Sequence, residues 1–252
     1  MNADQYLYFT LRREAVDAGP VSPARGVIAI LRPTLIEWAG NNFVGMMPSG
    51  SFAKGTANRS GTDIDLFISL SPTTPDNLRD IYNKLARHMT SKGYKAKPQN
   101  VSINIRVGAY DVDLVPAQRQ DNISADHSLY RRRVDTWTKT NVLKHIAHVR
   151  NANRLNESRI IKLWRNQRGL EFPSFYLELT VIDALFGARV GNLSANITTV
   201  LQYLVDRFEN ARVIDPANTA NIISEDLTVV EKTAIKRAAS AALNGSWAEL
   251  VK

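Results

Sequence analysis

The first half of the chain alternates between two patterns of apolar and polar residues. Helical spacing of apolar residues predicts helices at 1–18, 22–39 and 74–93, and Pro33 is expected to kink or interrupt the second. Runs of period two predict strands at 41–47, 63–70 and 101–117. The last run should fold back on itself at a tight turn at Gly108-Ala109, which makes it two strands. This half therefore predicts a small mixed sheet with helices on it.

After about residue 140 only helical patterns remain. They predict helices within 156–169, 172–191, 193–210 and 227–251. The last helix should open at Thr228, which with Glu231 forms a capping box. We therefore expect an α+β domain at 1–140 and an all-helical domain at 141–252, with a cleft between them.

Composition narrows the class of protein. The chain has 252 residues, 44% of them hydrophobic, and it contains no cysteine, which excludes disulfides, thiolate metal sites and a thiol nucleophile. It has no apolar run of 18 residues and no apolar leader near its start, so we expect no membrane span and a cytoplasmic location. The net charge of +8 fits a polyanionic partner such as nucleic acid or nucleoside triphosphates, although solubility alone would also account for it.

Paired aspartates lie inside one predicted strand. In Asp63-Ile64-Asp65-Leu66 the period of two directs both carboxylates to one face of the sheet and both apolar side chains to the other. Like charges at this spacing repel, so a cation should lie between them. Oxygen ligands without nearby His or Cys suit Mg²⁺, or Mn²⁺ in its place.

A third carboxylate on a neighbouring strand would complete a two-metal site. The candidates are Asp113 and, as the alternative, Asp111, which shares its face. Two metal ions about 4 Å apart stabilise both the attacking and the leaving oxygen of an in-line phosphoryl displacement. The residues Gly50 and Ser51 would bring backbone N–H groups and a hydroxyl to a phosphate, and Lys54 and Thr56 could reach the same triphosphate.

These motifs together resemble the signature of the polymerase-β-type nucleotidyltransferases. The matching residues are Gly50-Ser51, Asp63-Ile64-Asp65 and Val112-Asp113-Leu114-Val115-Pro116. The stretches "RIIKLWRNQRGLEFPSFYLELTVIDAL" and "VIDPANTANIISEDLT" are similar to the helical domain of oligoadenylate-synthase and cGAS/DncV-like enzymes and of archaeal CCA-adding enzymes. The resemblance implies a polymerase-β-like sheet followed by an oligoadenylate-synthase-like helical lobe, with the active site in the cleft.

The resemblance also implies roles for single residues. Asp63 and Asp65 would ligate two Mg²⁺ ions, and Asp113 would ligate the catalytic ion and help to activate the acceptor hydroxyl. The phosphates would contact residues of both domains, namely Gly50, Ser51, Lys162 and Ser174. Phe175 or Tyr176 would stack on the base, and the sequence does not choose between them.

Several of these residues also have ordinary structural interpretations. Lys162 could be a surface lysine, Ser174 a helix N-cap, and both aromatic residues plain core. His145 and His148 have helical spacing and are expected on a surface rather than on a metal. The run Arg131–Arg133 is interpreted as a solvated edge or as an electrostatic footprint for a polyanion such as RNA.

The resemblance implies a reaction in which a ribose hydroxyl attacks the α-phosphate of an NTP and pyrophosphate leaves. The sequence ends soon after Asp215-Pro216, which favours a bacterial cGAS/DncV-like synthase of cyclic or linear oligonucleotide messengers for antiphage signalling over a CCA-adding enzyme. The alternatives are terminal NMP transfer to tRNA, another RNA or a protein, and a binding module without catalysis.

Overall fold

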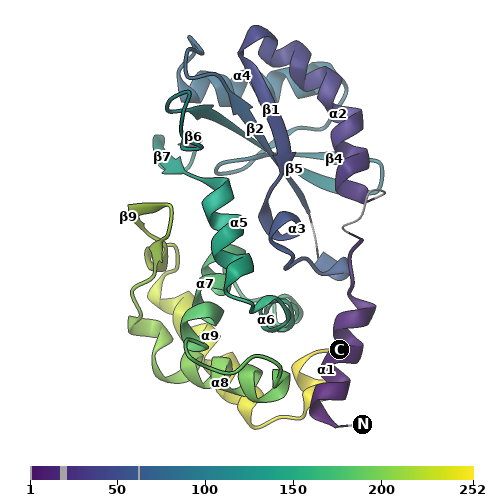
Figure 1. Ribbon diagram of the computed structural model, residues 1–252, viewed down its shortest axis with the longest axis vertical. Coiled ribbons are helices and arrows are strands. Elements are labelled where there is room, and N and C mark those ends of the chain that lie inside the picture. Colours follow the sequence, from purple (N-terminus) through teal and green to yellow (C-terminus); the bar gives the residue numbers. More distant parts are fainter. Residues whose placement is uncertain (1, 18–21, 62) are drawn as a thin grey trace. The chain divides into compact units, whose positions relative to one another are not determined.

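The computed structural model describes residues 2–17, 22–61 and 63–252, which form two compact units (Figure 1). We call one the sheet unit; it comprises Asp17–Ala53 and Asp63–Ile146. The other, the helical unit, comprises Met1–Val16, Lys54–Thr62 and Ala147–Lys252. The units are interleaved in the sequence, whereas the sequence analysis placed a single boundary at 140/141.

A seven-stranded sheet forms the centre of the sheet unit. Its strand order is β1-β2-β5-β4-β3, and β6 pairs with β5 and β7. β2 and β5 are parallel, and every other pair is antiparallel. The strands are β1 (Phe43–Pro48), β2 (Ile64–Leu70), β3 (Lys97–Pro98), β4 (Ile103–Val107), β5 (Tyr110–Arg119), β6 (His127–Arg131) and β7 (Thr136–Thr140).

Two helices, α2 (Pro23–Ala39) and α4 (Leu78–Ser91), pack on one face of this sheet (Figure 1). Their apolar stripes meet the alternate residues of β2 and β5 that point to this face, among them Ile64 and Leu66. The helix α2 runs through Pro33, so the predicted interruption is wrong, while the alternative of a kink stays a prediction; Pro33 is exposed, and Leu35 in the next turn is buried. A short 3₁₀ helix, η1 (Gly40–Asn42), follows α2.

The start of α4 differs from the prediction. The helix begins at Leu78 and not near Thr74, because the side chain of Asn77 accepts a hydrogen bond from the Asp80 N–H at 2.9 Å and caps it. Its end agrees with the prediction, since Gly93 follows the C-cap with a φ of +87°.

The helical unit has a separate apolar core. Leu7 and Leu11 of the first helix are buried in this core, so the N-terminal helix packs with α6 and α8. Its helices are α1 (Ala3–Arg13), α6 (Leu155–Gln167), α7 (Ser174–Ala184), α8 (Leu193–Asp206), α9 (Val229–Leu243) and α10 (Trp247–Leu250). The first helix is shorter than the predicted 1–18, and the predicted 227–251 helix is two helices. The predicted capping box at Thr228 is confirmed.

Several elements were not predicted. They are the helix α5 (Val142–Asn151), the strands β3, β6 and β7, and a hairpin of β8 (Ile214–Asp215) and β9 (Asn218–Ile222). The short helices α3 (Gly50–Lys54), η2 (Arg59–Gly61), η3 (Phe208–Asn210) and η4 (Ile223–Glu225) complete the inventory. Within the described residues, no helix is long and apolar enough to cross a membrane.

Candidate active site

The predicted carboxylates lie on one face of two adjacent strands. In the parallel pair of β2 and β5, Asp65 is directly opposite Asp113. Asp63 immediately precedes β2 and lies two residues before Asp65, which places it on the same face. The alternate residues are buried on the other face, as the exposure of 0% for Leu66 shows. The fold therefore assembles the three carboxylates that the sequence analysis selected.

Like charge and burial both act on this cluster. Burial raises the pKa of Asp113, and the nearby Asp111 carboxylate adds to the rise. The hydrogen bond that Asn104 Nδ2 donates to Asp113 Oδ1, at 2.9 Å, lowers the pKa of Asp113 in part. Partial burial raises the pKa of Asp63 as well, and the negative charges of Asp113 and Asp111 raise it further. Burial and like charge thus both disfavour the ionised forms of Asp63 and Asp113.

Asp111, the alternative third ligand, has a different environment. It lies opposite Arg106 of β4, and Arg106 Nη1 contacts Asp111 Oδ2 at 3.3 Å. Half of its side chain is exposed, at 47%. Because Asp111 already has a cationic partner and Asp113 faces Asp65, the geometry favours Asp113 as the third carboxylate.

The cluster fits a hard divalent cation by donor type. All of its donors are carboxylate oxygens, the ligands that Mg²⁺ prefers. In the part of the chain that the structure describes, no group of three or more His, Cys, Asp or Glu side chains is already arranged to hold a metal ion. The fit to the ion therefore rests on the donor type and on the register that sets Asp65 opposite Asp113.

Gly50 lies directly against one of these carboxylates. Its φ is +56°, and a Cβ built there would overlap the Asp65 carboxylate and lie 2.9 Å from Asp65 Cβ. The Ser49 N–H donates to the Asp65 carbonyl at 2.8 Å and fixes this approach. Ser51 follows in α3 and is half-buried. A glycine is thus required at position 50, for its backbone conformation and for space.

Lys54, Thr56 and Lys162, which the sequence analysis selected as triphosphate ligands, converge in the helical unit on Glu178. Lys54 Nζ contacts Glu178 Oε2 at 2.5 Å, and Thr56 Oγ1 donates to Glu178 Oε1 at 2.5 Å. Lys162 Nζ contacts Glu178 Oε1 at 3.2 Å and Thr56 Oγ1 at 3.3 Å. Glu178 has an exposure of 0%. The predicted phosphate ligands therefore form an internal charge network, and whether they also bind phosphate stays a prediction.

Glu178, the centre of this network, was not selected in the sequence analysis. Burial alone would raise the pKa of Glu178, but Lys54 and Lys162 hold that pKa below its usual range. Burial lowers the pKa of Lys162 despite this partner. The signal was a carboxylate in the apolar run "FYLELTVIDAL", because a buried charge requires a partner.

The helix α7 decides the open question about the two aromatic residues. Tyr176 has an exposure of 0% and packs on Phe172 and Phe208, at 5.2 and 5.3 Å between ring centroids. The possibility that Tyr176 stacks on a base is therefore wrong, because core residues cover its ring. Phe175 is half-buried, and its ring lies 4.6 Å from Lys54 Nζ.

Ser174 is the first residue of α7, and Pro173 is its N-cap, so the interpretation of Ser174 as the N-cap is wrong. The hydroxyl oxygen of Ser174 accepts hydrogen bonds from both terminal nitrogens of Arg165 at 3.3 Å. This arrangement brings a half-buried arginine to the predicted phosphate ligand. Arg165 had not been selected from the sequence.

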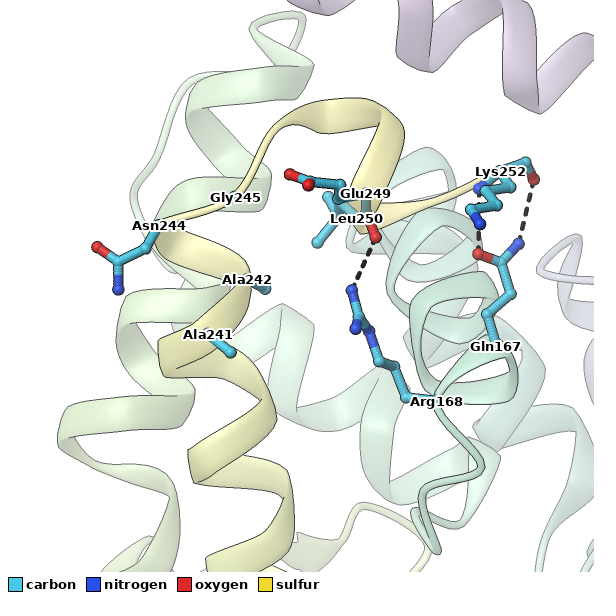
Figure 2. Close-up of a pocket in the computed structure, with 9 residues that line it drawn as sticks. All are labelled: Gln167, Arg168, Ala241, Ala242, Asn244, Gly245, Glu249, Leu250 and Lys252. Carbon is cyan, nitrogen blue, oxygen red and sulfur yellow. Dashed lines mark hydrogen bonds between the residues drawn. The ribbon is translucent and has the colours of Figure 1, made fainter.

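Other candidates lie away from these residues. Arg132 Nε donates to the Gln99 carbonyl at 3.1 Å, and Arg132 and Arg133 are exposed, as expected for a solvated edge. A cavity of about 800 Å³ in the helical unit contains none of the predicted site residues (Figure 2). The side chain of Gln167 holds the backbone of Lys252 there with two hydrogen bonds.

Comparison with known proteins gives three informative similarities. The cyclic AMP-AMP-AMP synthase of Escherichia coli (strain MS 115-1) is 26% identical over 211 residues, which cover 74% of this chain and 65% of that protein. The E. coli MS115-1 CdnC:HORMA-deltaN complex superposes with a TM-score of 0.75 at 22% identity, covering 97% of this chain and 90% of the other. The structure of the CD-NTase CdnG of Bradyrhizobium diazoefficiens in complex with GTP superposes with a TM-score of 0.81 at 15% identity, covering 97% of this chain and 91% of the other. No protein-family model matches.

The fold is that of a polymerase-β-type nucleotidyltransferase, a mixed α+β arrangement with a central sheet. The chain resembles the cGAS/DncV-like enzymes, as the sequence motifs had indicated. The matched segment spans 65% of the length of the E. coli synthase.

Proposed function

We propose that the chain is a metal-dependent nucleotidyltransferase that makes a cyclic or linear oligonucleotide from NTPs. One observation carries the proposal: Asp65 faces Asp113 across a parallel strand pair, on the same face as Asp63, with Gly50 packed against Asp65. Carboxylates on a sheet face with raised pKa values, next to a glycine turn, suit phosphoryl transfer. The similarity to the E. coli cyclic AMP-AMP-AMP synthase supports the same chemistry.

In the mechanism that we propose, Asp63, Asp65 and Asp113 would hold two Mg²⁺ ions, or Mn²⁺ in their place. Bound there, the metal would supply charge stabilisation for the attacking and leaving oxygens. Asp113 would help to activate the ribose hydroxyl and accept its proton, since it faces Asp65 across the strand pair. A bond forms from that oxygen to the α-phosphorus, the bond from the α-phosphorus to the bridging oxygen breaks, and pyrophosphate leaves.

The remaining residues would bind the triphosphate. Gly50 allows the backbone to approach a phosphate, and Ser51 adds a hydroxyl donor. For Lys54, Thr56, Lys162, Ser174 and Phe175 we retain the role in NTP binding that the resemblance implies. Glu178 would keep both lysines in place for it.

The biological setting that we propose is bacterial antiphage signalling from the cytoplasm. The support is the similarity to CdnC, whose structure was solved with a HORMA partner. A macromolecular partner would then control synthesis of the product or receive the product. This partner would be a protein, as in the CdnC complex, or an RNA bound on the basic surface.

The test is a product assay with the purified protein, all four α-³²P-labelled NTPs and Mg²⁺ or Mn²⁺, with and without total tRNA. We expect phosphatase-resistant small products without added RNA, which are absent in an Asp63→Asn, Asp65→Asn variant. Label that appears only on tRNA or on the protein would contradict the oligonucleotide product and favour terminal transfer instead.

A further inference from the structure

A second cavity lies on the carboxylate face of the sheet unit. It has a volume of about 250 Å³ and lies beside β1, β2, β5, β6 and the start of α5. Phe67 and Ser69, which line it, follow Asp65 in β2 at alternate positions and so point to the same face. At about 3.3 Å per residue, Phe67 lies about 7 Å and Ser69 about 13 Å from Asp65 along the strand.

One wall of this cavity carries a neutral histidine. His127 has an exposure of 5%, and burial lowers the pKa of its imidazole. Its Nδ1 lies 2.9 Å from the Ala125 carbonyl, which can only accept, so Nδ1 carries the proton. Its Nε2 therefore accepts the hydrogen bond from the Ser69 hydroxyl at 2.8 Å. The donor capacity of both side chains is used within the protein.

Arg119, which lines the cavity, carries one buried donor without a partner. It lies opposite His127 in the pairing of β5 with β6. Its Nε is buried and has no hydrogen-bond partner. Among the described residues, its guanidinium group makes no ion pair or side-chain hydrogen bond. An unsatisfied buried donor is costly and is rare in folded proteins, so a ligand that brings acceptor atoms is expected here.

The size and the lining limit what this ligand can be. Pockets for drug-sized molecules are about 300–1,000 Å³, so this cavity holds a single ring system and not a whole nucleotide. The rings of Phe67 and His127 pack in a T-shaped arrangement with 4.9 Å between their centroids, and Met47 and Val142 add apolar surface. The occupant is therefore a flat, largely apolar ring that carries acceptor atoms on one edge.

We propose that this cavity, which we call the Arg119 pocket, binds the base of the acceptor nucleotide and prefers a base with a carbonyl group. The inference rests on the proposed function, because it directs the ribose of that nucleotide towards Asp65. Arginine pairs with the O6 and N7 acceptors of guanine and suits a carbonyl of uracil. Adenine presents an amino donor where guanine presents O6, so the Arg119 pocket disfavours it.

Binding can be measured without catalysis, by NMR with ¹³C-methyl-methionine. The chain has four methionines, and Met47 lines the Arg119 pocket while Met89, with an exposure of 0%, lies in the core on the other face of the sheet. We expect guanosine or uridine to shift the Met47 methyl signal and to leave Met89 unchanged. Adenosine should bind at least about ten-fold more weakly.

The variant for this test is Arg119→Met, with Arg87→Met, an exposed arginine of α4, as its matched control. Arg119→Met should weaken guanosine or uridine binding about ten-fold or more, whereas Arg87→Met should leave it unchanged. An unchanged Met89 signal in both variants reports an intact core. Equal binding of adenosine and guanosine, or binding that survives Arg119→Met, would overturn the inference.

The inference and the proposed function can fail separately. Guanosine binding at Met47 in a protein that never releases pyrophosphate would leave the base site standing and refute its role in catalysis. Pyrophosphate release by a protein whose Met47 signal responds to no nucleoside would support the enzyme and refute the Arg119 pocket.

Discussion

The pKa values of two carboxylates, the half-buried Asp113 and the buried Glu178, are shifted in opposite directions by their surroundings. Asp113 lies near other carboxylates and has a raised pKa, and Asn104 donates its side-chain hydrogen bond. Glu178 is fully buried but meets two lysines, and its pKa is lowered. The first arrangement calls for a cation from solution, and the second carries its own.

Asp113→Asn should raise the melting temperature at neutral pH and abolish pyrophosphate release. The folded state raises the pKa of Asp113, so its protonation favours folding at low pH, and this contribution is lost as the pH rises through the folded pKa. At neutral pH the ionised Asp113 therefore costs stability. Burial of the charge is the main cause and the Asp111 carboxylate adds to it, and each kcal/mol of this cost that is relieved should raise the melting temperature by about 2–4 °C.

Thermal melts at a series of pH values check this prediction. The difference between variant and parent should shrink as the pH falls through the raised pKa of Asp113. Added Mg²⁺ should raise the melting temperature of the parent more than that of the variant. A variant that is less stable than the parent at neutral pH would contradict the electrostatic account.

Glu178→Gln should destabilise the helical unit strongly, because it leaves two buried lysines without their counter-charge. Breaking a buried ion pair costs about 3–5 kcal/mol. The control is Glu209→Gln, whose pairing with Lys236 at 2.7 Å is partly exposed to solvent and should therefore contribute far less to stability. Urea unfolding of both variants measures the difference, and equal losses would refute the special status of Glu178.

At the scale of elements, the parallel pairing of β2 with β5 creates the carboxylate cluster. Its register sets Asp65 opposite Asp113 and buries Ile64 and Leu66 under α2 and α4. A slip by one residue would exchange the two faces and bury both carboxylates, so the core fixes the site. The turn after β1 is equally restricted, because Gly50 leaves no room for a side chain.

Gly50→Ala should therefore remove activity, and Gly93→Ala is its matched control. Both glycines have positive φ, of +56° and +87°, so alanine at either position is strained by about 1–2 kcal/mol. At Gly93 the added Cβ meets nothing within 4 Å, whereas at Gly50 it displaces Asp65. Pyrophosphate release with Mg²⁺ should fall only in the Gly50 variant; equal activity of the two would contradict the proposed packing.

The sequence predicted the elements whose periodicity is strong. Strands β2, β4 and β5, with the turn at Gly108, and the helices α2, α4, α6 and α8 follow from their apolar patterns. Strand β7 was missed because its first residues are exposed on both faces, so its sequence "TWTKT" shows no clear alternation. The hairpin of β8 and β9 is too short to give a pattern.

The candidate site was predicted unevenly for a related reason. Asp63 and Asp65 are two residues apart, so the period of two places them on one face, and Asp113 lies in a strand whose pattern is regular. The network around Glu178 joins residues 124 positions apart in the chain, as in the pair with Lys54. No local pattern reports such a contact, and the orientation of Tyr176 depends equally on distant packing.

At the scale of the whole molecule, the core of the helical unit does not follow the order of the sequence. Leu7 and Leu11, near the N-terminus, are buried with residues from beyond position 160. The sheet unit is built around β2 and β5. The stability of the helical unit therefore depends on a helix that precedes the whole sheet in the sequence.

Leu7→Ala should cost about 2–5 kcal/mol, because it opens a cavity in the core of the helical unit. Its neighbour Tyr8 is 37% exposed, and Tyr8→Ala should cost less than about 1 kcal/mol. Hydrogen exchange locates the effect, and we expect faster exchange in α6 and α8 for Leu7→Ala. Faster exchange confined to β2 and β5 would contradict the assignment of this helix.

The most direct test of nucleotidyl transfer at the carboxylate cluster is pyrophosphate release by the purified protein. The assay uses NTPs with Mg²⁺ or Mn²⁺ and compares the parent with the Asp63→Asn, Asp65→Asn variant. The account predicts metal-dependent release by the parent and a loss of at least about 100-fold in the variant. Release that persists in the variant, or that needs no metal, would contradict it.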